Sequence, residues 1–249
     1  MKFINRQQAT KETGLSYIGK VNHSSKHFKA YSYDEYVYTI YLAPALMSGY
    51  EVCPMRTNEC TLLCLNESGQ NLMYNHINES RIKKTKLFFE NRDYFMRWII
   101  DEIKYYQEKA KSNGFKFSVR LNNTSDISPE MFYIIENGVK QNILEMFPDV
   151  QFYDYTKVFN RIKLLEKYPN YDLTFSYNGE NKNEIISLLN NGHRVAIVFQ
   201  NVPENYLGFK VIDGDKYDMR YKDEKNVIVG LKFKKVRNTL LLSHKFVVQ

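Results

Sequence analysis

Strand-like and helix-like segments alternate along this chain from residue 36 onward, and this alternation limits its fold more than any other feature. Five strand-like segments are β-branched, aromatic or alternately apolar; they cover residues 36–42, 115–121, 150–155, 171–176 and 194–199. Helix-like segments separate them, at residues 88–113, 128–146, 158–168 and 181–190. Such alternation favours a parallel sheet with right-handed connections. We therefore predict one α/β domain over residues 36–249, with a partial or full (βα) barrel-like parallel sheet.

Three parts of this prediction rest on local signals. Ser128 followed by Pro129 is typical of a helix start, so a helix is expected from there to about Met146. Segments 207–213 and 227–233 look like strands with no helix between them, which favours antiparallel or edge strands. Residues 1–35 are polar and aperiodic, and we expect an N-terminal arm or capping element.

The composition indicates a folded, basic protein. The 249 residues include 35 Lys and Arg against 28 Asp and Glu, a formal net charge of +7. No apolar run approaches the ~20 residues that span a bilayer, and the N-terminus lacks the apolar stretch of a signal peptide, so we expect a cytoplasmic protein without membrane contact. The positive charge gathers in residues 1–30, 81–120 and 211–249, at +5, +6 and +4. These basic segments could contact nucleic acid or a partner protein, although lysine-rich segments are also common on ordinary solvated faces.

The only three cysteines fall within twelve residues, in the loop that follows the first predicted strand. Cys53, Cys60 and Cys64 are interleaved with polar residues, which is unlike a core segment. Thiolates are soft ligands that suit an iron–sulfur cluster or zinc. Zinc would require a fourth ligand, for which His76 is the nearest histidine downstream. Three unrelated buried cysteines are the alternative interpretation.

Polar residues follow the ends of the predicted strands. Because parallel strands bring their carboxyl ends to one edge, ligand sites of α/β proteins collect there. We expect this edge to carry the cysteine loop and a set of polar side chains: Arg120, Asn122, Ser125, Asp126, Asp154, Lys157, Ser176, Asp213 and Asp215. The alternative interpretation of these polar residues is that strand ends are simply where polar loops begin.

Several ordered motifs resemble the bacteriophage "gene product eighty-eight" family over residues 40–249. They are Leu42-Ala-Pro-Ala45, Cys53-Pro54 with Cys60 and Cys64, Arg120-Leu-Asn122 with Ser125-Asp126, Phe152 to Lys157, and Val211 to Asp215 with Asp218 and Arg220. The resemblance implies a phage or prophage origin and therefore a place in the host cytoplasm, where the basic segments could contact nucleic acid or a host protein. It implies no defined biochemical activity.

The architecture also resembles the radical S-adenosylmethionine enzymes, whose partial barrel holds a four-iron cluster on three cysteines after the first strand. That resemblance implies a 4Fe-4S cluster on Cys53, Cys60 and Cys64, and S-adenosylmethionine as a second cofactor. It would place cofactor-binding groups at Arg120, Asn122, Ser125, Asp126 and Ser176, and substrate-facing groups at Asp154, Lys157, Asp213 and Asp215. The cysteine gaps of six and three residues differ from that family's usual three and two.

Two other functions stay open. One is a regulator that binds nucleic acid or a host protein through its basic segments, with zinc or a cluster only bracing the cysteine loop. The other is a divalent-metal hydrolase or nuclease, because carboxylate oxygens suit Mg²⁺ and related ions. Its ligands would be Asp126, Asp154, Asp213, Asp215 and Asp218.

Overall fold

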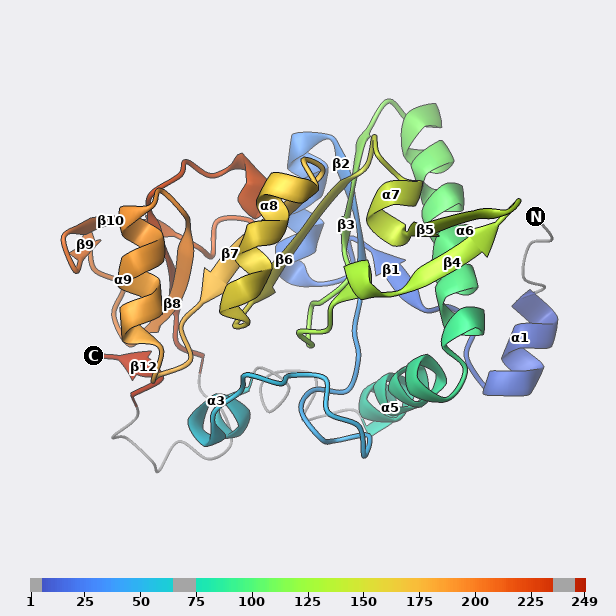
Figure 1. Ribbon diagram of the computed structural model, residues 1–249, viewed down its shortest axis with the longest axis horizontal. Helices are drawn as coiled ribbons and strands as arrows, with labels where there is room; N and C mark the ends of the chain where they lie inside the picture. The colour runs from blue at the N-terminus through green and yellow to red at the C-terminus, as the bar shows by residue number, and fades with distance from the viewer. Residues whose placement is uncertain (1–5, 65–74, 235–244) are drawn as a thin grey trace.

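The computed structural model describes residues 6–64, 75–234 and 245–249, and most of its strands join one large sheet (Figure 1). Across this sheet the order is β1-β2-β3-β6-β7-β8-β11-β10-β9, and β12 also pairs with β8. Its strands are β1 (Gly19–Val21), β2 (Glu35–Ile40), β3 (Lys116–Arg120), β6 (Gln151–Thr156), β7 (Tyr171–Ser176), β8 (Val195–Phe199), β9 (Asn205–Tyr206), β10 (Phe209–Asp213), β11 (Ile228–Lys232) and β12 (Val247–Val248). The predicted α/β class is thus confirmed.

The sheet is open, so of the two predicted forms, a partial or a full barrel, the fully closed barrel is wrong. Strands β2, β3, β6, β7, β8, β11 and β10 run parallel. The flanking strands β1 and β9 are short and antiparallel to their neighbours. Closure requires the two edge strands to pair. Among the described residues, β1 pairs only with β2 and β9 only with β10.

Helices cover one face of the sheet. The described helices are α1 (Arg6–Thr13), α2 (Ser25–Phe28), α3 (Asn58–Leu62), α5 (Asn75–Glu90), α6 (Arg92–Ser112), α7 (Ile143–Met146), α8 (Leu164–Lys167) and α9 (Lys182–Asn190). Figure 1 shows α6, α8 and α9 over the strands, which they contact at β3, β7 and β8. Because β2, β3, β6, β7 and β8 lie in chain order, right-handed connections place their helices on the same side. The main core fills this layer, where α6 buries Phe95, Trp98 and Ile99.

The other face is covered by shorter segments. The 3₁₀ turns η1 (Lys29–Tyr33) and η5 (Arg220–Lys222) contact β2 and β7, and η1 follows α2. Their apolar contacts form a small second core of Ala30, Val37, Tyr153 and Met219. Two further 3₁₀ turns, η3 (Pro129–Met131) and η4 (Phe159–Lys163), are not part of this second core. This face therefore holds few apolar side chains, and much of its interior is polar.

The predicted helix at residues 128–146 is wrong. Ser128 and Pro129 do begin a turn, but it is only η3, and a hairpin of β4 (Tyr133–Glu136) and β5 (Val139–Asn142) follows. Asn137 and Gly138 join its strands, both with positive φ, at 52° and 81°. Asn-Gly is the favoured pair for this tight hairpin turn. The turn therefore outweighs the helix-start signal, and only α7 is helical within that range.

Two other predictions need correction. Strands β10 and β11 are parallel, because β11 inserts between β8 and β10 instead of pairing back as a hairpin. The single helix expected at residues 88–113 is two helices, α5 and α6, which meet at Asn91. The Asn91 side chain accepts the Tyr94 amide and begins the second helix.

Part of the predicted N-terminal arm belongs to the sheet, since β1 pairs with β2 from Gly19 opposite Ile40 to Val21 opposite Tyr38. Residues 1–5 and 235–244 of the basic segments lie outside the described residues. No described helix is long and apolar enough to cross a membrane.

Candidate functional site at the carboxyl edge of the sheet

A buried carboxylate, Asp154 in β6, ties together the ends of three strands. Asn122, just beyond β3, donates its backbone amide to Asp154 Oδ1 at 2.7 Å and its side-chain amide to Oδ2 at 3.2 Å. Tyr171 of β7 donates its hydroxyl to Oδ2 at 3.0 Å. Burial raises the pKa of Asp154 to about 6, against the opposing charges of Arg120 and Arg161. Asp154 was expected to face a substrate, and the structure leaves it 1% exposed.

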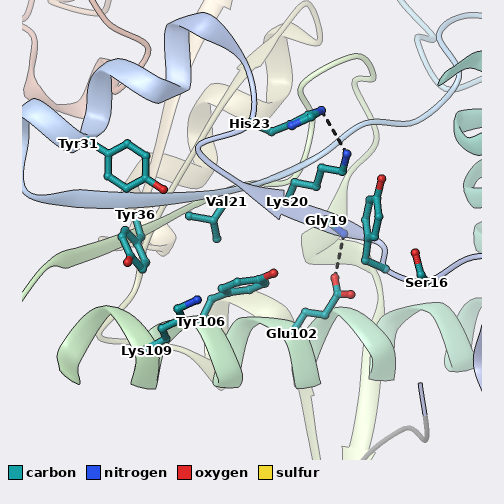
Figure 2. A pocket seen from close by; sticks show the side chains of 11 residues that line it. Ser16, Gly19, Lys20, Val21, His23, Tyr31, Tyr36, Glu102, Tyr106 and Lys109 are labelled. Atoms are coloured by element: carbon teal, nitrogen blue, oxygen red, sulfur yellow. Dashed lines mark hydrogen bonds between the residues drawn. The ribbon is translucent and has the colours of Figure 1, made fainter. Parts of the chain in front are cut away.

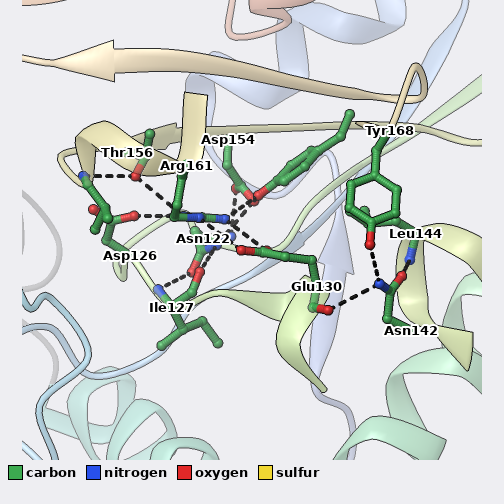
Figure 3. Close-up of polar contacts among 12 residues, drawn as sticks. Asn122, Asp126, Ile127, Glu130, Asn142, Leu144, Asp154, Thr156, Arg161 and Tyr168 are labelled. Atoms are coloured by element: carbon green, nitrogen blue, oxygen red, sulfur yellow. Dashed lines mark hydrogen bonds and ion pairs between the residues drawn. The ribbon is translucent and has the colours of Figure 1, made fainter. Parts of the chain in front are cut away.

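Arg161 in η4 is a buried cation at this end of the sheet, and no sequence pattern indicated its role. Its Nη1 donates to Asp126 Oδ1 at 2.8 Å, and its Nη2 donates to the Tyr171 hydroxyl at 2.6 Å. Glu130 forms a further ion pair at 3.3 Å. Figure 3 shows the guanidinium between Asp126 and Glu130. The partners of Arg161 are spread from residue 126 to residue 171. No short sequence pattern therefore indicates its role, and only the folded chain shows it.

Six predicted residues do come together here. Lys157 donates its backbone amide to Asp126 Oδ2 at 2.7 Å and its Nζ to the Ser176 hydroxyl at 3.2 Å. Ser125 donates its hydroxyl to Asn122 Oδ1 at 2.9 Å. Continuous hydrogen bonding thus joins the loops after β3 and β6 to the end of β7. The six residues are Asn122, Ser125, Asp126, Asp154, Lys157 and Ser176.

The cysteine segment, residues 52–64, rests on the loop that follows β3. The Asp126 amide donates to the Val52 carbonyl at 2.7 Å. The Cys53 thiol donates to the Thr124 carbonyl, with sulfur and oxygen 3.9 Å apart. These bonds place Cys53 beside the carboxyl end of β3, where the sequence predicted a site.

The same segment is also attached to the loop that follows β7. Thr57 donates its hydroxyl to the Asn178 carbonyl at 2.9 Å, and Asn178 returns its side-chain amide to the Met55 carbonyl at 3.2 Å. The Thr57 hydroxyl also accepts the Cys60 amide at 3.1 Å and so caps α3. The cysteine segment therefore spans the carboxyl edge from β3 to β7.

The three thiols have different surroundings. Burial raises the pKa of Cys53 to about 12, although the nearby Lys157 charge lowers it, and Cys64 is close enough to influence it as well. Cys60 packs against the apolar cluster of Leu63 and Phe246. Across the described residues, no three His, Cys, Asp or Glu side chains are gathered closely enough to hold one metal ion. His76, the proposed fourth zinc ligand, is exposed at the start of α5.

On the opposite face, Asp218 holds a buried group of charges. Its Oδ2 lies 2.7 Å from His27 Nε2, 2.6 Å from Arg120 Nη1 and 3.2 Å from the Tyr153 hydroxyl. Burial alone would raise the pKa of Asp218, but Arg120 and His27 outweigh it and hold the pKa well below its usual value. Arg120, predicted to bind a cofactor, therefore already has a carboxylate partner. His27 was not predicted, because it lies 191 residues from Asp218 in the chain.

Several buried polar groups on this face lack partners. Side chains alternate along a strand, so Ser118 and Arg120 of β3 point to the same side, and Thr174 of β7 lies opposite Tyr155 of β6. The Arg120 guanidinium lies 4.8 Å from the Tyr155 ring centre. Four of their atoms have no hydrogen-bond partner among the described residues: Ser118 Oγ, Arg120 Nε, Tyr155 Oη and Thr174 Oγ1. Native interiors leave few such groups, so this face is unusually polar for a core.

Asp213 and Asp215 lie apart from the group around Asp154. They sit at the end of β10 and in the turn beyond it, and β7, β8 and β11 separate β10 from β6. Asp213 accepts the Asp215 amide at 2.8 Å, which closes the turn. Asp215 pairs with Lys26 at 3.4 Å. The structure therefore divides the predicted aspartates between two ends of the sheet.

The family resemblance is confirmed by comparison with known proteins. No curated protein and no solved structure matches the chain. Residues 2–245 match the family described as Gene product 88, which extends the resemblance to nearly the whole chain and takes in β1, the cysteine segment and the Asp218 group. The chain therefore belongs to the Gene product 88 family.

Proposed function

We propose that the protein binds an iron–sulfur cluster through Cys53, Cys60 and Cys64 at the carboxyl edge of its open parallel sheet. The observation that carries this proposal is the attachment of the cysteine segment to the loops after β3 and β7, through Cys53 and Thr57. These contacts hold the cysteine segment at the edge where parallel α/β sheets place their ligand sites. A plain surface loop has no need of cysteines at this position.

The donor set suits a cluster better than a lone zinc ion. Three thiols are available within the cysteine segment, and the nearest proposed nitrogen donor, His76, is exposed on a separate helix. Cys53 and Cys64 are within electrostatic reach of each other, and all three cysteines are partly exposed. Cys60 packs toward Phe246, so cluster binding requires it to turn toward the other two thiols. In this proposal that rearrangement accompanies assembly.

When bound, a cluster supplies one-electron chemistry, and the chain supplies binding and orientation. Three cysteines would leave one iron of a four-iron cluster without a protein ligand, open to a small molecule such as S-adenosylmethionine. Lys157, Ser176 and Asn178 lie beside the cysteine segment. They would bind polar parts of that molecule or of a substrate.

Anaerobic reconstitution with ferrous iron and sulfide tests the proposal. The wild-type protein is expected to turn brown and absorb near ~400 nm, as thiolate-bound clusters do. Cys53→Ser, Cys60→Ser and Cys64→Ser should each lose most of this absorbance. Ser48→Ala, which alters a nearby loop without removing a thiol, is the matched control. A colourless protein that instead takes up one zinc ion per chain would refute the proposal.

A further inference from the structure

A separate pocket of about 370 Å³ lies between the edge strand β1 and helix α6. Four tyrosines contribute to its walls: Tyr17, Tyr31, Tyr36 and Tyr106. The polar groups at its rim include Lys20 and His23 from the N-terminal segment and Lys109 from the last turn of α6. Figure 2 shows Tyr31, Tyr36, Tyr106 and Lys109 on one side of Val21, with Lys20 and His23 on the other.

The carboxylate at the base of this pocket is already in use. Glu102 accepts the Ile18 amide at 3.0 Å, the Gly19 amide at 2.8 Å and the Tyr38 hydroxyl at 2.6 Å. It is 3% exposed. These bonds hold β1 against α6 and leave Glu102 little capacity to bind the lysines at the rim. The cations of the pocket therefore keep donors for a ligand.

Positive charge dominates around the pocket. The ammonium groups of Lys20 and Lys84 lie 4.7 and 4.5 Å from the centre of the Tyr17 ring. Burial lowers the pKa of His23, and the charges of Lys20 and Lys84 lower it further. Burial likewise lowers the pKa of Lys84 to about 8. Like charges held this close favour an anionic ligand, which relieves their repulsion.

Aromatic walls beside lysines match the two parts of a nucleotide. Planar bases stack on aromatic side chains, and phosphates bind lysine ammonium groups. Tyr31 is 39% exposed, and its ring lies nearly perpendicular to the Tyr36 ring with centres 5.8 Å apart. The volume falls within the range of small-molecule sites, about 300–1,000 Å³.

We propose that this pocket binds a nucleotide, with the base against Tyr31 and Tyr106 and the phosphate at Lys109. The nucleotide is either free or one unit of a single strand. The site joins the basic segments 1–30 and 81–120, which are far apart in the chain. No cysteine lines it, so it does not depend on the cluster proposed above.

Calorimetric titration with deoxyadenosine monophosphate and with a short oligodeoxyadenylate tests this proposal on the full chain. Saturable binding of the monophosphate indicates a free-nucleotide site, and binding of the oligonucleotide alone indicates a subsite for a strand. Lys109→Met and Tyr31→Leu are each expected to weaken the binding about tenfold, through lost phosphate contact and lost stacking.

Lys111→Met is the matched control, because it removes the same charge from the same exposed end of α6 without touching the pocket. It should change the affinity less than twofold, on the order expected for distant screened charge. Circular dichroism confirms that each variant is folded. The proposal is overturned by absence of saturable binding to either ligand, or by equal weakening in Lys109→Met and Lys111→Met.

Discussion

Asp218 is the residue on which the polar face of the sheet depends most. It is 3% exposed and is the common partner of His27, Arg120 and Tyr153. A buried charge whose partner is removed keeps its desolvation cost without compensation. Asp218 thus ties β3 and β6 to the segment between β10 and β11 through buried polar contacts.

Replacing that carboxylate should destabilise the fold strongly. Asp218→Asn is expected to lower the free energy of unfolding by about 3–5 kcal/mol, because Arg120 loses its buried counter-charge. Urea titration followed by circular dichroism measures this. Asp149→Asn, at an exposed position, is the control and should change stability by less than about 0.5 kcal/mol. Equal effects in the two variants would show that Asp218 is not a structural centre.

Asp154 should give the stability a distinct pH dependence. The folded pKa of Asp154, about 6, lies above the ordinary value of 3.8, so the folded state holds this proton more tightly than the unfolded chain does. The contribution of Asp154 to the free energy of unfolding is fully present below about pH 4. It is lost as pH rises through about 6, by up to about 3 kcal/mol. Asp154→Asn should lack this loss.

The comparison of the two proteins isolates Asp154 from Glu102 and Asp172, whose pKa values burial also raises. Urea titrations at intervals between pH 4 and 7 provide the measurement. If the wild-type and variant profiles run parallel, Asp154 does not titrate as described.

Single elements were predictable where the pattern of apolar and polar residues follows the burial of each side chain. Strand β3 was expected because its side chains alternate between the core and the polar face. The hairpin of β4 and β5 was missed, since Ser128-Pro129 also starts helices and the decisive turn, Asn137-Gly138, lies eight residues further on. The helix-start signal and the hairpin-turn signal compete in this segment. The hairpin forms, and it also buries Ile134.

Strand β1 depends on one glycine. A Cβ at Gly19 would lie 2.2 Å from the Tyr38 ring, which is fully buried and bonded to Glu102. Gly19→Ala should therefore lower the free energy of unfolding by about 1–3 kcal/mol, as overpacking does. Thermal or urea unfolding measures it.

A double-mutant cycle separates this clash from a general effect of alanine in the strand. In a Tyr38→Ala background the ring is absent, so Gly19→Ala should cost less than about 0.5 kcal/mol. An unchanged cost in that background would contradict close packing of β1 on the Tyr38 ring.

At the scale of the whole molecule, the sequence predicts the class of fold but not its closure. Alternating strands and helices specify parallel neighbours, whereas an open or closed sheet depends on what lies at the flanks. Here β1 and β9 run antiparallel, and the segment carrying Asp218 and Arg220 covers the face that a barrel would enclose. The contacts that decide this, such as His27 with Asp218, join residues from opposite ends of the chain.

The candidate site was predicted only in part, because some of its contacts also join distant parts of the chain. Strand ends identified Asn122, Asp126, Asp154 and Lys157, which the fold brings together. Arg161 shows no local signal, and its partners become visible only when the loops after β3 and β6 meet. The cysteine segment spans this edge from β3 to β7, so the proposed function is tested there.

Iron and acid-labile sulfide content per chain, measured after anaerobic reconstitution and removal of unbound metal, tests that function most directly. A four-iron cluster on three cysteines predicts about four iron and four sulfide per chain. The triple variant Cys53→Ser, Cys60→Ser, Cys64→Ser should retain almost none. Iron without sulfide, or equal iron in the wild type and the triple variant, would contradict a cluster at the carboxyl edge of the sheet.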